Sequence, residues 1–314
     1  MLLFNLFRHL NIYKMKTNYI LFFFFYLIST NIKSQSSDFL SNLDSAYYYY
    51  DSLNYSKSKD FFLKLTNFDE CRSKDYFYLS SCYSNLNKVD SGFIYLEKAI
   101  EYGWNYSDTS LISKDIKIIN LTKSKNFAPI KIKLILLTKN KISIDTSLQN
   151  YFYYLRDRDQ KYRKLSTDSM TWLKQEKLDL ENQMVLDSFI KVNGWPRLSI
   201  HGEDVVRIAW LIAQHADNNI SFQLKCLENM KKLFKYNEIS LSNYAYLFDR
   251  IQINSCKEQV YGTQYSILFD ENNSFKSIEF KPISESKLVN KRRRYMNLPS
   301  LDSYRKTAEN RYRK

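Results

Sequence analysis

The sequence has 314 residues but only 5 Gly and 4 Pro, where average usage would give about 22 and about 16. Folds built mainly from tight turns are therefore disfavoured. Glycine-rich phosphate loops need glycines at short, fixed spacings. No two of the five glycines have such a spacing: Gly92, Gly103, Gly194, Gly202 and Gly262. The sequence thus excludes nucleotide binding through those loops.

Cysteine and histidine are also scarce, with 4 Cys and 3 His. Four scattered cysteines do not make a disulfide framework in a chain of this length. If Cys71 and Cys82 stand on one helix, they lie about 16 Å apart along its axis, beyond disulfide reach. We expect them to pack as small core residues. No pair has the C-x-x-C spacing typical of zinc sites, so we predict no metal and no cofactor.

The N-terminal segment has the pattern of a secretory signal peptide. Lys16 precedes an apolar run over residues 20–28, and the small residue Ser34 stands at the expected cleavage point. Residues 1–34 are therefore predicted to direct export to the periplasm or the extracellular space, with Met1 or Met15 as the start. The alternative is an uncleaved anchor, although the run is shorter than the ~20 residues that span a bilayer.

Positive charge dominates the sequence, with a formal net charge of +14. Most of the excess lies near the two ends, because residues 35–280 carry nearly equal numbers of cations and acids. The runs Lys291–Arg294 and Arg311–Lys314 are predicted to be a solvated basic tail, with contact to an acidic envelope surface as the alternative. In an exported protein this distribution argues against nucleic-acid binding. Membrane contact is expected only through the N-terminal segment or this tail.

The first half is similar to itself at a spacing of 34 residues. Small residues align with small ones and large with large: Ala46 with Ser80, Ser58 with Gly92, and Phe62 with Leu96. Thirty-four residues is the tetratricopeptide period, and residues 40–105 resemble a pair of such repeats. A degenerate helical unit extends the predicted repeat domain over residues 40–137, followed by a linker over 138–150. The resemblance implies a groove for a protein or peptide partner, unless aromatics such as Tyr47 to Tyr50 fill the core instead.

The second half, residues 151–305, is predicted to be an α+β domain. Apolar positions recur at helical spacing in four stretches, which predicts helices over 151–193, 203–215, 221–236 and 241–248. Short alternating runs then predict strands over 251–254, 259–269 and 275–280. The chain is therefore expected to be mainly α, with tetratricopeptide-like helical hairpins before a helical domain that carries a short antiparallel sheet. Residues 306–314 end the predicted basic tail.

Several short motifs in this half resemble a bacterial domain of unknown function that often follows a signal peptide or helical repeats. They include Asp159-Gln160 with Arg163, Gly194-Trp195-Pro196, Gln214-His215-Ala216-Asp217, Asp249-Arg250 and Tyr261-Gly262-Thr263-Gln264. The resemblance covers residues 150–305, and it implies a fold and a candidate site but no reaction. Two positions depart from it, because Cys256 and Asn297 stand where the family favours glycine.

His215 is the only histidine among these motifs, and a partly buried imidazole can act as general acid or base. Asp217 and Asp249 are the candidates to orient it, and His215 with Asp249 is the predicted catalytic pair. The predicted ligand-binding residues offer charged or hydrogen-bonding groups: Asp159, Arg163, Asp217, Arg250, Tyr261, Thr263 and Gln264. The alternative is structural, with Asp159 and Arg163 as an i,i+4 pair and Asp249 tying a helix to the sheet. No serine or cysteine lies in a recognisable activating turn.

The predicted function is ligand or partner binding by an exported protein. The repeats supply a surface for a protein or peptide partner, and the second domain binds a small polar ligand around His215. The alternative is a cell-envelope hydrolase or transferase that uses His215 as its general acid or base.

Overall fold

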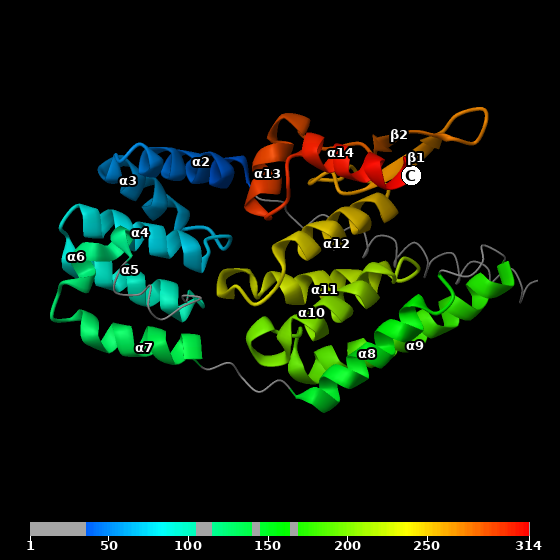
Figure 1. The fold of residues 1–314 in the computed structure, drawn as a ribbon, viewed down its shortest axis with the longest axis horizontal. Coiled ribbons are helices and arrows are strands. Elements are labelled where there is room, and N and C mark those ends of the chain that lie inside the picture. Colours follow the sequence, from blue (N-terminus) through cyan, green and yellow to red (C-terminus); the bar gives the residue numbers. More distant parts are fainter. Residues whose placement is uncertain (1–35, 105–114, 140–144, 164–168, 314) are drawn as a thin grey trace, which may run out of the picture. The chain divides into compact units, whose positions relative to one another are not determined.

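The structure is a computed structural model that describes residues 36–104, 115–139, 145–163 and 169–313. The predicted signal peptide, residues 1–34, lies outside the described residues. Helices make up most of the fold, and a two-stranded antiparallel sheet lies near the C-terminus (Figure 1). The predicted fold class is thus confirmed. Among the described residues, no helix combines the length and the apolar character that crossing a membrane requires.

The first half is built from consecutive helical hairpins. Helices α2 (Ser37–Asp51) and α3 (Tyr55–Leu65) form one, and α4 (Ser73–Asn85) and α5 (Val89–Glu101) form the next. Each of these helices packs against the one that follows it. Large apolar side chains such as Phe62 and Leu96 are buried, as are Cys71 and Cys82. The helical structure is consistent with the predicted repeats, and the two cysteines pack as predicted.

Small residues lie where the two helices of each hairpin cross. In the first hairpin the Ser58 hydroxyl donates to the backbone oxygen of Ala46 over 2.9 Å. In the second the Ser80 hydroxyl donates to the backbone oxygen of Gly92 over 2.7 Å. Because Ala46 aligns with Ser80 and Ser58 with Gly92, the same contact recurs with donor and acceptor exchanged between the helices. A bulky side chain at any of these buried positions would push the two helices apart.

Further short helices continue this part of the chain. They are η2 (Ile116–Ile118), α6 (Ile119–Thr122) and α7 (Phe127–Lys139). Helix α6 packs against both α4 and α5, and Leu121 is fully buried there. The expected degenerate unit is therefore helical where it is described. The linker predicted over 138–150 contains the end of α7 and the start of the next helix, while residues 140–144 lie outside the described residues.

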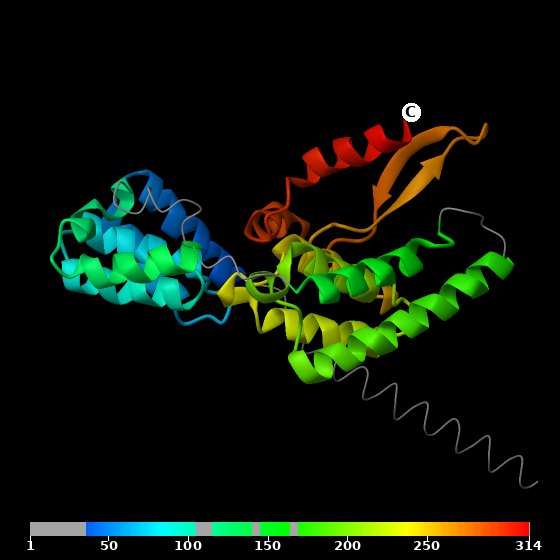
Figure 2. The same cartoon turned by 60° about the horizontal axis from the view of Figure 1, so that its bottom comes forward.

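The helices of the second half gather around one central helix. They are α8 (Thr146–Gln160), α9 (Ser169–Asn193), α10 (Leu198–Gln214), α11 (Ile220–Lys231), η3 (Phe234–Tyr236) and α12 (Leu241–Asn254). Helix α10 packs against α8, α9, α11 and α12, and Val205, Ile208 and Ile212 on it are buried. Figure 2 shows α8 and α9 lying side by side. Helix α9 ends just before Gly194, as predicted.

Helix α10 bends at Gly202, whose φ of 81° and ψ of 167° belong to a region that essentially only glycine adopts. Before the bend, Glu238 fixes the chain by accepting from the backbone N–H of Ser199 over 2.8 Å. After the bend the helix is regular and ends at Gln214. This geometry places His215 at the C-terminal end of the central helix, as predicted.

Strands β1 (Tyr265–Phe269) and β2 (Phe275–Phe280) form the sheet, with Tyr265 opposite Phe280 and an irregularity at Leu268. The strand predicted over 275–280 is confirmed, and the one predicted over 259–269 begins only at Tyr265. The strand predicted over 251–254 is wrong, because α12 continues to Asn254 and buries Ile251 one turn after Leu247.

Cys256 follows helix α12 with φ at 57°. This is the left-handed conformation that glycine usually provides after a helix.

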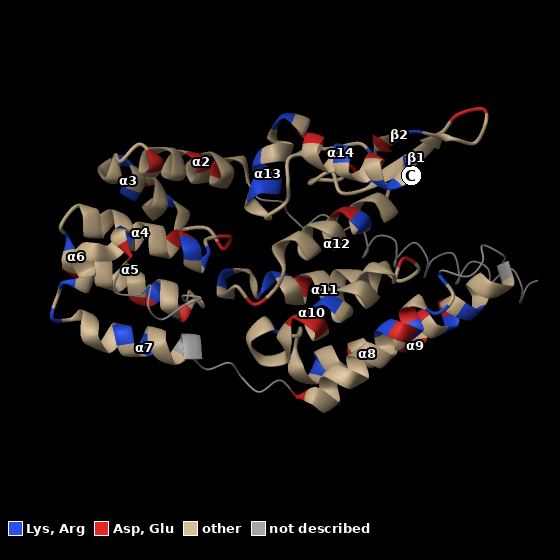
Figure 3. Cartoon of the chain, viewed as in Figure 1, with Lys and Arg blue, Asp and Glu red and all other residues tan. Residues whose placement is uncertain are grey.

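The chain closes with η4 (Ser286–Leu288), α13 (Val289–Tyr295) and α14 (Leu301–Tyr312), and α14 packs on β2. Basic residues cover α13 in Figure 3. The prediction that this run is a solvated tail is wrong for Arg292 and Arg293, which are 1% and 0% exposed. Their guanidinium groups donate to backbone oxygens inside the fold, among them those of Val260 and Tyr261.

Candidate functional site

A buried carboxylate from another helix holds His215. The Nδ1 atom of His215 lies 2.8 Å and 2.9 Å from the two carboxylate oxygens of Asp159, near the end of α8. The Asp159 side chain is 2% exposed and the His215 side chain is 20% exposed. Because an ionised carboxylate only accepts hydrogen bonds, the neutral imidazole carries its proton on Nδ1. Within the described residues, Nε2 has no hydrogen-bond partner.

Asp159 also belongs to a network of side chains between α8 and α9. Arg163 Nη2 lies 3.6 Å from Asp159 Oδ1 and donates to Asp179 Oδ2 over 2.6 Å. The Gln175 amide donates to Asp179 Oδ1 over 2.7 Å and to the backbone oxygen of Asp159 over 2.9 Å. One guanidinium and one amide thus tie two carboxylates together. We call Asp159, Arg163, Gln175, Asp179 and His215 the histidine cluster.

The histidine cluster keeps hydrogen-bonding capacity that the protein itself does not use. Arg163 Nε is buried and has no partner in the part of the chain that the structure describes. Burial raises the pKa of Asp179 above its ordinary value, although the hydrogen bond from Gln175 and the charge of Arg163 act in the opposite direction. Buried polar groups are costly unless they find partners. His215 Nε2 is therefore an acceptor available to a polar ligand, whereas Arg163 Nε is an unused donor enclosed within the described part of the cluster.

An ion pair at the surface flanks His215. Arg250 Nε and Nη2 donate to the two carboxylate oxygens of Asp217 over 2.6 Å and 2.5 Å, and Asn254 donates to the same carboxylate over 2.9 Å. Burial alone would raise the pKa of Asp217, but the hydrogen bonds and the charge of Arg250 outweigh it, and the pKa lies below its ordinary value. The guanidinium of Arg250 is therefore occupied by Asp217.

Unlike Asp159, whose carboxylate meets side chains, Asp249 is held mainly by backbone N–H groups. Its Oδ1 accepts from the backbone N–H of Val260 over 2.7 Å and of Tyr261 over 3.0 Å. Its Oδ2 accepts from the backbone N–H and the hydroxyl of Thr263, each over 2.9 Å. The residue is fully buried. Burial raises the pKa of Asp249, while these four hydrogen bonds act against that shift. The carboxylate thus holds α12 to the loop before β1.

The buried arginines of α13 hold the other side of the same loop. Arg293 Nη1 donates to the backbone oxygens of Tyr261 and Gly262 over 2.6 Å and 3.1 Å, and its Nε donates to that of Pro299. Arg292 Nη1 donates to the backbone oxygens of Ser284 and Val260. This explains why part of the basic run is inside the fold. We call Asp249, residues 260–263, Arg292 and Arg293 the loop cluster.

The structure separates the predicted site residues into these two clusters. It joins His215 to Asp159 and Arg163, and it places Asp217 with Arg250 beside them. The remaining predictions lie in or next to the loop cluster: Asp249, Tyr261, Thr263 and Gln264. The prediction that Asp217 or Asp249 orients His215 is wrong, because Nδ1 is bonded to Asp159. Gln264 bonds within the loop region, with its backbone N–H donating to Gln259 Oε1 over 2.8 Å.

Two members of the histidine cluster are missing from the sequence prediction, namely Gln175 and Asp179. A signal exists, because Gln175, Asp179 and Asn182 recur at spacings of four and three residues on one face of α9. Gln175 and Asn182 are 0% exposed. The apolar side chains on another face of this helix are exposed: Leu173, Leu180 and Met184. In the first half of α9 this inward polar stripe reverses the usual amphipathic pattern, so the apolar side chains there indicate the wrong face. In the second half Leu186 and Ile190 are buried, as the usual pattern predicts.

Residues 159–314 match the model of a protein family described as a family of unknown function, DUF6624. The match begins at Asp159 and includes both clusters. This finding agrees with the predicted resemblance of the second half to a domain of unknown function. Comparison with curated proteins and with solved structures finds no match. Among the described residues, no group of three or more His, Cys, Asp and Glu side chains is arranged to hold a metal ion.

Proposed function

We propose that the histidine cluster binds a small polar ligand. The observation that carries the proposal is that a buried carboxylate holds Nδ1 of His215 while Nε2 remains without a partner in the described chain. The 20% exposure of this side chain lets a ligand reach the imidazole. A ligand with a hydrogen-bond donor would satisfy Nε2.

A cell-envelope hydrolase or transferase is the second candidate function. The hydrogen bond to Asp159 supports it, because the proton on Nδ1 leaves Nε2 as the nitrogen that can accept a proton from a substrate group. In such a reaction, a water molecule or a substrate hydroxyl would lose its proton to Nε2 as its oxygen attacks. His215 would then return that proton to the leaving group.

The proposal extends to export and to a partner surface. The residue pattern over 1–34 supports export, and the hairpins α2 to α5 supply a surface for a protein or peptide. Of the four consecutive tyrosines on α2, Tyr50 is buried in the core, whereas Tyr48 is 67% exposed. The Tyr49 ring stacks on Phe61 and has the ammonium of Lys57 5.1 Å from its centre. These rings could therefore serve both the core and an aromatic, cationic contact surface.

The test is to identify what the protein captures. The full chain, expressed with its own N-terminal segment in a bacterial host, is analysed by native mass spectrometry beside the His215→Asn variant. Asparagine can still donate to Asp159 but lacks an atom at Nε2. We expect a small molecule bound to the wild type and absent from the variant, with equal melting temperatures. His201→Gln, outside the cluster, is the control and should retain the molecule.

Incubation of the captured compound with the protein separates the two candidate functions. Chemical conversion by the wild type, lost in His215→Asn, would assign catalysis. Unchanged compound after prolonged incubation would assign binding. Equal capture by wild type and variant would contradict a site at His215.

A further inference from the structure

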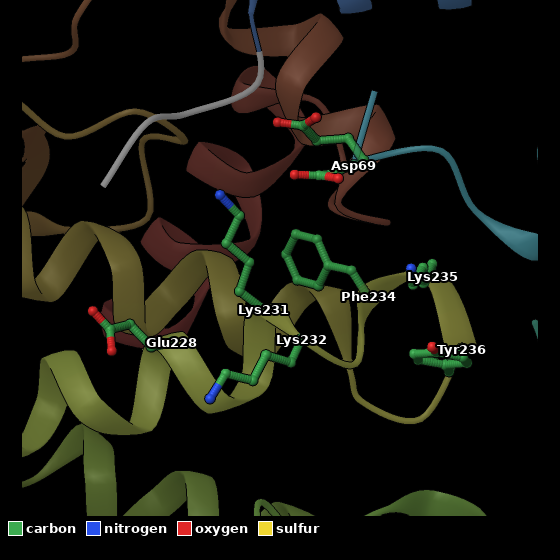
Figure 4. A pocket seen from close by; sticks show the side chains of 8 residues that line it. Asp69, Glu228, Lys231, Lys232, Phe234, Lys235 and Tyr236 are labelled. Carbon is green, nitrogen blue, oxygen red and sulfur yellow. The ribbon is translucent and has the colours of Figure 1, made fainter. Parts of the chain in front are cut away.

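A pocket of about 520 Å³ lies apart from the histidine cluster, within the size range of ligand sites. Its walls come from the loop that follows α3 and from the end of α11 with η3. Figure 4 shows the Phe234 ring inside it, with Lys231 and Asp69 on different sides of that ring. Six of its lining residues are charged, three of each sign: Asp69, Glu70, Glu228, Lys231, Lys232 and Lys235.

The charged groups around this pocket are not paired with one another. No ion pair within 4.0 Å involves any of the six in the described chain. Lys235 contacts aromatic rings instead, with its ammonium 5.3 Å from the centre of the Tyr102 ring. In Figure 4 Lys231 extends past the Phe234 ring toward the level of Asp69, whereas Lys232 and Glu228 point away from that ring. Lys231 and Asp69 therefore offer opposite charges, which do not neutralise each other, to a ligand that carries both signs.

The walls of the pocket are fixed by contacts between segments far apart in the sequence. The Tyr295 hydroxyl donates to the backbone oxygen of Glu70 over 2.6 Å. The Arg72 guanidinium lies 4.1 Å from the centre of the Tyr295 ring and donates to the Tyr295 backbone oxygen. On the η3 side, a Cβ on Gly103 would lie 2.4 Å from the backbone oxygen of Tyr236. Such close packing holds the two acids of the loop at a set place relative to the lysines.

We propose that this pocket binds the free ends of a short peptide, that is, a ligand with an ammonium and a carboxylate on an apolar body. The carboxylate would pair with the ammonium of Lys231, and the ligand ammonium with Asp69 and Glu70. The apolar body would lie against the edge of Phe234 that remains exposed, 4% of the residue. The proposal adds a second site to the proposed function and does not depend on the histidine cluster.

The test uses calorimetric titration of the full chain with the dipeptide alanylleucine. Its N-acetylated and C-amidated forms each lack one of the two end charges. We expect the free dipeptide to bind, and each capped form to bind at least about tenfold more weakly, because each loses a charge-assisted hydrogen bond. Lys231→Met keeps the hydrocarbon stem and should weaken binding of the free dipeptide by a similar factor. Lys306→Met, exposed on α14, is the matched control and should change nothing.

Three results would overturn the proposal. They are the lack of any heat of binding at millimolar dipeptide, equal binding of the free and capped forms, and full affinity in a folded Lys231→Met protein. Glu70→Gln provides a second variant on the opposite wall. It should weaken the free dipeptide but leave the weak binding of the N-acetylated form unchanged.

Discussion

Two buried aspartates of the second half, Asp159 and Asp249, show how differently the same side chain can be used. The carboxylate of Asp249 accepts from three backbone N–H groups and one hydroxyl. The carboxylate of Asp159 meets side chains: the imidazole of His215, the amide of Gln160 and the guanidinium of Arg163. Backbone donors neither titrate nor move, whereas the imidazole can exchange protons.

The difference separates scaffold from candidate site. The loop cluster joins α12, α13 and the loop before β1 through backbone groups, so its task is to fix the fold. The histidine cluster joins side chains to one another and, among the residues that the structure describes, leaves one imidazole nitrogen and one guanidinium N–H without partners. Both clusters contain residues of the sequence motifs. They differ less in burial than in the hydrogen-bond partners of the central aspartate, which are mainly backbone groups in the loop cluster and side chains in the histidine cluster.

The largest effect on stability is expected at Asp249. Asp249→Ala leaves four donors without their acceptor, and each unsatisfied buried group costs about 1–3 kcal/mol. We predict a loss of about 4 kcal/mol or more in the free energy of unfolding, measured by urea denaturation. Asp302→Ala, an exposed acid at the start of α14, is the control. If Asp249→Ala lost less than about 1 kcal/mol in the free energy of unfolding, the loop cluster could not be called the structural counterpart of the histidine cluster.

The next effect is expected at Arg293, on the other side of the same loop. Arg293→Met keeps much of the buried stem but removes the donors to three backbone oxygens. We predict a loss of about 2–3 kcal/mol. Its neighbour Arg294, 77% exposed, is a matched control, because Arg294→Met should stay within about 0.5 kcal/mol of the wild type. Equal losses in the two variants would show that the burial of Arg293 contributes nothing specific.

Asp159→Asn should cost less stability but more function. The asparagine oxygen can still accept from Nδ1 of His215, so the expected loss is about 1–2 kcal/mol. The asparagine amide can also turn its NH₂ group toward Nδ1, so the imidazole is no longer held in the tautomer that leaves Nε2 as an acceptor. We therefore predict that the variant stays folded in circular dichroism while native mass spectrometry finds the captured ligand lost. Retention of the ligand at the wild-type level would place Asp159 with the scaffold.

The smallest effect concerns the Asp217–Arg250 pair and its pH dependence. The pKa of Asp217 in the folded chain lies below the ordinary value of 3.8. Its stabilisation is therefore present above that value and is lost as the pH falls through the lower folded pKa. The Asp217 side chain is 42% exposed, so Asp217→Asn should cost less than about 1 kcal/mol at neutral pH. This deficit should shrink in urea denaturation as the pH falls below 3.8 and through the lower folded pKa, and a deficit that grows on acidification would contradict the assignment.

Local sequence patterns predict the helices and strands of this fold well where apolar side chains face the core and polar side chains face solvent. The stop of α9 before Gly194 and the strand over 275–280 follow from single residues and alternation. The run Ile251–Asn254 misleads because Ile251 belongs equally to an alternating pattern and to the helical series with Leu247. Only packing of α12 against α10 and α11 decides between them.

The candidate site is harder to predict because its contacts span long separations. His215 could be identified as a solitary histidine among motifs. Its partner Asp159 lies 56 residues away, and no spacing rule relates them. The inward polar stripe with Gln175 reverses the apolar signal on α9. Likewise, charge indicates a solvated surface for Arg292 and Arg293, although their guanidinium groups find backbone oxygens inside the fold.

The most direct test of this account is the tautomer of His215, read from long-range ¹H–¹⁵N spectra well above the ordinary histidine pKa of about 6.5. His201 is an internal reference, because its Nδ1 accepts from the backbone N–H of Arg197 over 3.0 Å and its proton must lie on Nε2. We predict the opposite tautomer for His215, with the proton on Nδ1, and a weaker preference in Asp159→Asn, whose amide can offer Nδ1 either an acceptor or a donor. A proton on Nε2 of His215 in the wild type would contradict the central claim that Asp159 holds the imidazole with Nε2 free for a ligand.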